Sequence, residues 1–284
     1  MGESKHRRLK PAATTNKGET VKRIWTAVFA LLLTGSAAIA QDKTLNFGAL
    51  EPLSAEAARA KIDAWLQEVG KSDQATRERV ESIWRKNDTT VLDRVTEAIV
   101  TADPAAAKLL ADARDPAIPA PTKIPDILKS EKASAFYRAN LGLAYARALS
   151  NRRIHEESLE VLKSVRPEHV VDPAAYLFHR AVAEHALLNK GEATKTIVRL
   201  LEDAANSPER YKTVSALMLL DMQAWKEKDL ASIARKMENI ERRLDLARGG
   251  PQTQKIQKEV IARLDELIRE LENKAKKKSK PGGS

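Results

Sequence analysis

The sequence predicts an all-α protein, and three observations lead to this class. Ala, Leu, Glu, Lys and Arg dominate every long segment, and these residues favour helices. Apolar residues recur at spacings of three and four, whereas β-branched runs with a period of two are hard to find. Only 11 Gly and 12 Pro occur in 284 residues, which is typical of long elements joined by few elaborate loops. At this length we expect one large or two modest domains.

The N-terminal residues 1–40 predict an export signal. A basic pair at 22–23 precedes an apolar run at 24–33, and a small-x-small triplet follows at 38–40. These are the three parts of a secretory signal peptide, so we expect cleavage before Gln41 and a periplasmic or secreted protein. The alternative is an uncleaved N-terminal membrane anchor, because the whole stretch from the apolar run to the triplet carries no charge.

Residues 54–114 predict a unit of four helices, which follows a flexible lead-in at 41–53. Each helix has a capping side chain directly before an apolar stripe. The expected starts are Ser54, Ser72 or Asp73, Asp88 to Thr90, and Asp103-Pro104. Gly70 is the expected end of the first helix, since glycine is common just after a helix C-terminus.

A proline-rich linker at 115–125 is expected to separate this unit from the rest of the chain. It holds four prolines, which cannot continue a helix and favour an extended spacer. Beyond it, residues 126–248 predict about three α-hairpins. Long helices are expected to begin near Glu131, at Asp172-Pro173 and at Ser207-Pro208, each followed by a turn and a shorter helix.

Two short motifs resemble the tetratricopeptide repeat. Leu141-Gly142-Leu143-Ala144-Tyr145 is similar to the L-G-x-x-Y signature of its first helix, and Lys190-Gly191-Glu192 resembles its turn. The resemblance covers residues 130–247 and departs from the family at Arg138, where the repeat has Trp. It implies a stack of α-hairpins with a concave groove that binds peptides or partner proteins, and it assigns no functional residue.

After Gly249-Gly250-Pro251, residues 252–275 predict an amphipathic helix with coiled-coil a/d spacing. Two heptads are too short to be stable alone in water, so we expect this face to be buried. The sequence leaves three alternatives for what buries this face: the chain's own hairpin stack, a second copy of the chain, or a foreign partner. The candidate interaction residues are Val260, Ile261, Leu264, Leu267, Ile268 and Leu271. The segment 254–272 also resembles a C-terminal helix of exported planctomycete proteins of unassigned function.

The formal charge of +10 lies in the two ends of the chain. Residues 1–40 hold seven Lys and Arg against two acids, and a basic disordered tail is expected at 276–284. The body between them is close to neutral, so we expect no nucleic-acid partner. The tail could instead attract an envelope surface or another polyanion. The lysines concerned are Lys274, Lys276, Lys277, Lys278 and Lys280.

No catalytic apparatus is recognisable. The chain has no Cys, and His179 and His185 are six residues apart, unlike the i, i+4 pair of a helical zinc site. Phosphate-binding glycine loops and a G-x-S-x-G motif are missing from the sequence. We therefore expect no catalytic residues, no cofactor and no metal. The favoured hypothesis is a non-catalytic exported scaffold or interaction module, a polyanion-binding protein is the alternative, and an enzyme is the third.

Overall fold

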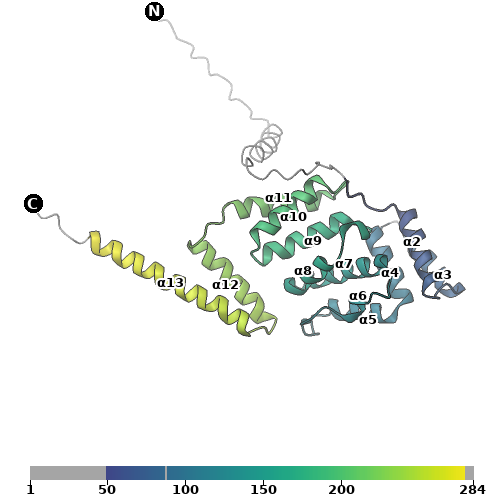
Figure 1. Ribbon diagram of the computed structural model, residues 1–284, viewed down its shortest axis with the longest axis horizontal. Coiled ribbons are helices and arrows are strands. Elements are labelled where there is room, and N and C mark those ends of the chain that lie inside the picture. The colour runs from purple at the N-terminus through teal and green to yellow at the C-terminus, as the bar shows by residue number, and fades with distance from the viewer. Residues whose placement is uncertain (1–48, 87, 279–284) are drawn as a thin grey trace, which may run out of the picture. The chain divides into compact units, whose positions relative to one another are not determined.

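A computed structural model describes residues 49–86 and 88–278. In this part of the chain, twelve α-helices and one short 3-10 helix occur without a sheet (Figure 1). The all-α prediction is therefore confirmed. The predicted signal peptide, its cleavage before Gln41 and the alternative membrane anchor lie outside the described residues. Within them, no helix combines the length and the hydrophobicity needed to cross a membrane.

The four predicted N-terminal helices are present. Their side-chain caps are Ser54, Asp73, Thr90 and Asp103, each of which accepts a hydrogen bond from a backbone N–H of the first turn. Gly70 follows the first helix with φ of +67°, as expected for a helix end. The helices are α2 (Ala55–Glu68), α3 (Gln74–Trp84), α4 (Val91–Ala102) and α5 (Pro104–Arg114).

The proline-rich segment at 115–125 lacks a helix but does not separate two cores, which corrects the predicted linker. A short helix, α6 (Asp126–Lys129), follows it, and then α7 (Ala135–Asn151) packs against α4, α5 and α6. One apolar core runs from Leu50 to Tyr211 across this segment. The segment is held by hydrogen bonds to its carbonyl groups, from Arg152 to Ile118 and from Arg248 to Pro121.

The prediction of a flexible lead-in at 41–53 is wrong for its last residues. Leu50 is buried, and its backbone forms a parallel bridge with Ala204. The Leu50 N–H donates to the carbonyl of Asp203 at 2.9 Å, and the N–H of Ala205 donates to the carbonyl of Leu50 at 3.1 Å. An apolar side chain that fits into the core thus fixes the chain just before α2. Residues 41–48 of the lead-in lie outside the described part.

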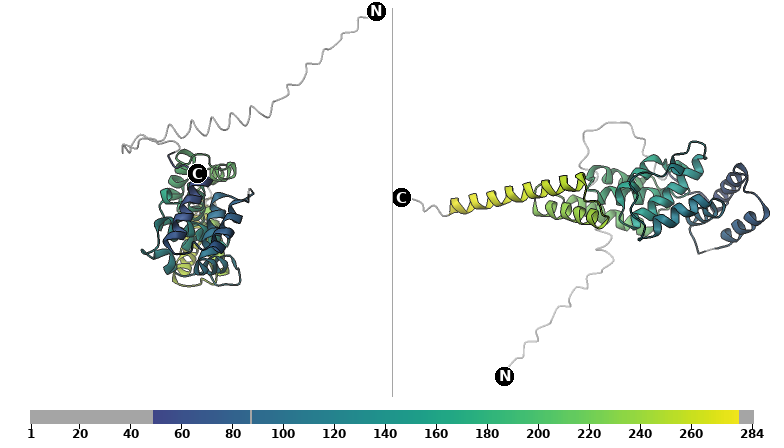
Figure 2. Two further views of the ribbon diagram at one scale, coloured as in Figure 1. Left: turned by 90° about the vertical axis from the view of Figure 1, so that its right-hand side faces the viewer. Right: turned by 90° about the horizontal axis from the view of Figure 1, so that it is seen from below.

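Three consecutive α-hairpins follow the proline-rich segment (Figures 1 and 2). The first begins at Ala135, four residues beyond the predicted start. Each hairpin turn contains one non-glycine residue with positive φ, namely Arg153, Leu188 or Lys228. The hairpins are α7 with α8 (His155–Ser164), α9 (Pro173–Ala186) with α10 (Lys190–Glu202), and α11 (Glu209–Gln223) with α12 (Leu230–Asp245). The 3-10 helix, Pro167–His169, connects the first two. The tetratricopeptide assignment itself stays a prediction.

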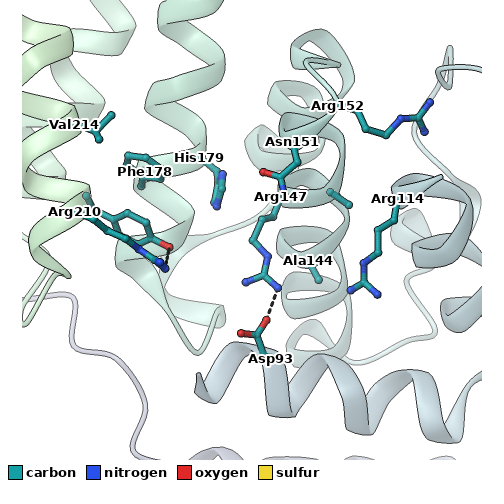
Figure 3. A pocket seen from close by; sticks show the side chains of 12 residues that line it. Asp93, Arg114, Ala144, Arg147, Asn151, Arg152, Phe178, His179, Arg210 and Val214 are labelled. Atoms are coloured by element: carbon teal, nitrogen blue, oxygen red, sulfur yellow. Dashed lines mark hydrogen bonds and ion pairs between the residues drawn. The ribbon is translucent and has the colours of Figure 1, made fainter. Parts of the chain in front are cut away.

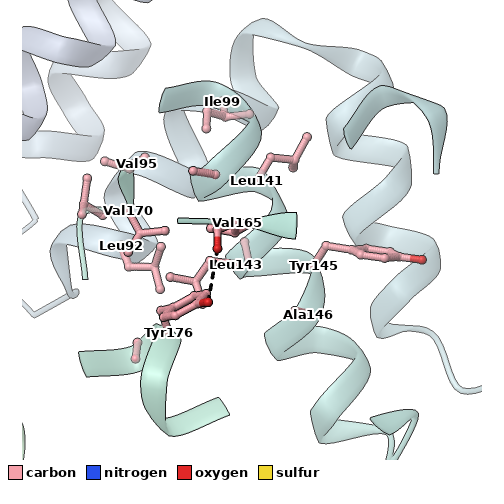
Figure 4. Close-up of a cluster of buried hydrophobic side chains, with 14 of the residues drawn as sticks. Leu92, Val95, Ile99, Leu141, Leu143, Tyr145, Ala146, Val165, Val170 and Tyr176 are labelled. Carbon is pink, nitrogen blue, oxygen red and sulfur yellow. Dashed lines mark hydrogen bonds between the residues drawn. The ribbon is translucent and has the colours of Figure 1, made fainter. Parts of the chain in front are cut away.

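Helix α7 lies at the centre of the core (Figure 4). Leu141 and Leu143 are fully buried, and the hydroxyl of Tyr176 on α9 donates to the carbonyl groups of Leu162 and Val165. Gly142 permits the close approach of α8, because a Cβ atom there would lie 3.2 Å from Cγ2 of Val165. The core is therefore apolar and tightly packed, and the buried hydroxyl of Tyr176 is satisfied.

The C-terminal helix α13 (Pro251–Lys278) packs against α12 and is longer than predicted (Figure 2). It includes residues 276–278, which were expected to belong to a disordered tail. Ala and Lys are good helix formers, and cations near a helix C-terminus interact favourably with its dipole. These two effects explain why the helix continues into the lysine-rich segment. Lys280 lies outside the described residues.

Candidate functional site

The first helices of the three hairpins line a basic groove, a cavity of about 710 Å³ (Figure 3). Helix α7 contributes Ala144 and Ala148, whose small side chains leave the space open. They are four residues apart and so lie on one face of the helix. Helices α4, α5, α9 and α11 supply the remaining walls. The groove therefore collects residues from five helices that are far apart in sequence.

Four arginines line the groove, and two of them have polar partners in the structure. Arg147 forms an ion pair with Asp93 on α4. Arg152 donates to the carbonyl groups of Asp112 and Ala113, as well as to that of Ile118. Arg114 and Arg210 are exposed, and neither forms an ion pair with any residue that the structure describes. In Figure 3 these two side chains approach the groove from opposite sides of the Asp93–Arg147 pair.

The electrostatic balance of the groove is positive at neutral pH. Burial would raise the pKa of Asp93, but the hydrogen bonds from Arg147 and Thr90 and the charge of Arg147 together outweigh it, so the pKa is lowered and the carboxylate stays charged. Burial, together with the charges of Arg147 and Arg210, lowers the pKa of His179 to about 4. His179 is therefore neutral at pH 7, and four guanidinium groups face one carboxylate.

An aromatic wall completes the groove. Phe178 on α9 and Tyr211 on α11 are stacked, with ring centroids 4.2 Å apart, and the guanidinium of Arg210 lies 5.0 Å from the Tyr211 ring. The lining contains no serine, threonine, cysteine or lysine that could act as a nucleophile. Elsewhere in the described residues, no group of three His, Asp or Glu is placed to hold a metal ion. Guanidinium and aromatic groups suit binding of a carboxylate-bearing chain.

A second cluster of charges holds α12 against the first hairpin. Glu156, in the first turn of α8, accepts hydrogen bonds from Arg242 at 2.9 and 2.7 Å and pairs with Arg243 as well as with Arg248. Arg242 and Arg243 are buried. Burial would raise the pKa of Glu156, but the arginines outweigh it and hold this pKa at about 2.

The predicted interaction residues of the C-terminal helix differ in burial. Val260 is buried against α12 and Leu267 is half-buried. The remaining four, which carry the a/d spacing, are 38–65% exposed; they are Ile261, Leu264, Ile268 and Leu271. Thr253 and Val260 are the buried residues of α13 among those described, with Ile256 half-buried between them.

Sequence reasoning missed the groove residues and the role of Glu156. The available signal in α7 was the spacing of Ala144, Arg147 and Ala148. Residues three and four apart are neighbours on a helix surface, so this spacing places a charge beside two small side chains. No comparable signal marked Arg114 or Arg210, because their meeting depends on how the hairpins pack. In comparisons with known proteins, no family model, no curated protein and no solved structure matches this chain.

Proposed function

We propose that the chain is an exported, non-catalytic scaffold that binds an acidic segment of a partner protein in the basic groove. The observation that carries this proposal is the pair of unpaired cations, Arg114 and Arg210, on opposite sides of a groove built from three hairpins. Export rests on the signal-peptide pattern of residues 1–40.

The chemistry of the groove favours carboxylates. Guanidinium groups form bidentate hydrogen bonds with carboxylates, and hydrogen bonds to charged groups are worth about 1.5–3 kcal/mol each. The stacked rings of Phe178 and Tyr211 offer an apolar wall beside Arg210. An extended peptide with acidic and apolar side chains would use both kinds of surface. A purely apolar peptide would leave the guanidinium groups without partners.

Removal of the two free cations tests the proposal. The variant Arg114→Ala with Arg210→Ala should bind a fluorescent glutamate-rich peptide at least about tenfold more weakly than the unaltered chain, a loss of about 1.4 kcal/mol. The control is Arg77→Ala with Arg79→Ala, which removes the same charge from the exposed side of α3. Equal weakening in both variants would show non-specific attraction, and unchanged binding in the groove variant would contradict the proposal.

The lysine-rich end of α13 supports a second candidate, contact with an envelope surface or polyanion. Lys274, Lys276 and Lys277 are exposed on the last turns of the helix. Clustered lysines next to an amphipathic helix attract anionic headgroups. Changing all three to Gln should abolish sedimentation with anionic vesicles if this candidate is correct, while peptide binding in the groove stays unchanged.

A further inference from the structure

The hairpin of α12 and α13 exposes a large apolar face, which we call the C-terminal face. The face consists of one stripe of apolar side chains on each helix, and the exposed fractions of these side chains range from 38% to 70%. They are Leu230, Met237 and Leu244 on α12, and Ile261, Leu264, Ile268 and Leu271 on α13. Soluble monomers rarely expose a contiguous apolar surface of this kind unless it binds something.

Helix geometry places both stripes on the same side of the hairpin. At 100° per residue, the α12 stripe lies at least about 140° from Asn239, which donates a hydrogen bond to the carbonyl of Ala186 on α9. On α13, the stripe and Arg263 lie on opposite sides of Val260, and Arg263 donates to the carbonyl of Lys228 in the α11–α12 turn. Because the two helices are antiparallel, both stripes turn away from the other hairpins.

The relative height of the two helices is set by contacts between them. Arg243 donates to the hydroxyl of Thr253, and Lys236 forms an ion pair with Glu259 at 2.7 Å. At this register, Glu241 on the outer edge of α12 and Lys258 on the outer edge of α13 differ in height by about one helical turn. Neither forms an ion pair with a described residue. The face thus has Glu241 at its α12 edge and Lys258 at its α13 edge.

We propose that the C-terminal face binds the same face of a second copy of this chain. A twofold axis parallel to the helices sets α12 of one copy against α13 of the other, which brings Glu241 opposite Lys258 along both edges. The result is a four-helix bundle made of two hairpins, the usual solution for two helix pairs with apolar faces.

The extent of the face supports a second copy as its occupant. Stable dimers bury about 800 Å² per partner, with an apolar centre and a polar rim. Seven large apolar side chains with charged edges match this composition. The arrangement is isologous, so each copy supplies one Glu241 and one Lys258 to the two edges. The basic groove lies on the first helices of the hairpins and does not include any residue of the C-terminal face.

The mass of the full chain in solution tests this proposal. We expect a dimer by light scattering at tens of micromolar, and a monomer for Ile261→Glu with Ile268→Glu. Both positions are more than half exposed, so the two glutamates should not lower the melting temperature of the folded chain. The control, Leu217→Glu with Leu220→Glu on α11, should stay dimeric. These two leucines are 59% and 47% exposed and lie outside the C-terminal face.

A charge exchange tests the twofold arrangement. Glu241→Lys and Lys258→Glu should each weaken dimerisation severalfold, and the two changes together should restore it. A chain that is monomeric at these concentrations would overturn the proposal, including one that instead binds vesicles through this face. A dimer that survives the two glutamates on α13 would overturn it as well.

Discussion

The body around α7 and the C-terminal hairpin of α12 and α13 are both helical, but they are held together by different forces. The body has one continuous apolar core that extends from Leu50 to Tyr211. From residue 224 onward, only Ile233 and Val260 are buried apolar side chains among the described residues. The C-terminal hairpin is attached chiefly through Glu156 and its arginines. A region attached by charges can leave its apolar side chains exposed and available for binding.

The two kinds of attachment respond differently to mutation. Removing one apolar side chain from a core leaves a cavity, whereas removing one partner of a buried ion pair leaves a charge without compensation. Arg242 is 3% exposed, so it cannot regain water without moving α12.

Glu156→Gln should have the largest effect. It removes the carboxylate that pairs with the buried Arg242 and Arg243, whereas Arg248 keeps its ion pair with Glu157, and the loss of one partner from a buried pair typically costs about 3–5 kcal/mol. Urea unfolding should show this loss, and amide exchange should increase in α12 and α13 before it increases in α7. The control Glu160→Gln changes an exposed acid on the same helix and should stay within about 0.5 kcal/mol.

Acid should destabilise the protein in two steps. Burial and the charge of Arg242 lower the pKa of His155 to about 4, whereas an unfolded histidine titrates near 6.5. The unfolded chain therefore binds the proton first, and the free energy of unfolding should fall as pH decreases from 6.5 to 4, by up to about 3 kcal/mol for this histidine. Glu156, with its pKa of about 2, should add a further loss between pH 4.5 and 2.

The variant His155→Gln isolates the first of these steps. It should reduce the slope of the unfolding free energy against pH between 6.5 and 4 and leave the loss at lower pH in place. His179 contributes to the same window from the body, because its pKa is also lowered to about 4. If the unfolding free energy of His155→Gln keeps its full slope between pH 6.5 and 4, then His155 binds its proton at the ordinary pH in the folded protein as well, which would contradict the prediction.

How far sequence predicts this structure depends on the range of the interactions. Helix starts such as Ser54 and Asp103 were predictable because a cap involves only neighbouring residues. The partners of Glu156 lie 86 and more residues away, so its first-turn position indicated only a favourable helix dipole. Periodicity likewise revealed the stripe on α13 but not which helix face α12 covers.

Gly142→Leu tests the packing of the body and should lower stability by about 1–3 kcal/mol through overpacking. Val165 and Val161 lie 3.2 and 3.5 Å from the position of the added Cβ, so α8 would have to shift. Gly191→Ala is the matched control, since nothing lies within 4 Å of its Cβ position in α10. It should raise the melting temperature slightly, as helix propensity predicts. Equal effects of both changes would contradict the close contact of α7 with α8.

Ala247→Gly should have the smallest effect, a gain of about 0.5–1 kcal/mol. Ala247 has φ of +57° at the end of α12, a conformation that costs a residue with Cβ but not glycine. Its N–H donates to Leu244, and the next N–H, of Arg248, donates to Arg243, as in a helix C-cap that favours glycine. Thermal unfolding measures the gain. A loss of stability would show that the turn before α13 relaxes to negative φ in solution.

Hydrogen–deuterium exchange with a short polyglutamate peptide tests the central claim most directly, which is that the groove and the C-terminal face bind different partners. The full chain should gain protection in α7, α9 and α11 when the peptide is added, while exchange in α12 and α13 stays as it was. The variant Arg114→Ala with Arg210→Ala should lose this protection. Protection that instead appears along α13, or that persists in the variant, would contradict the account.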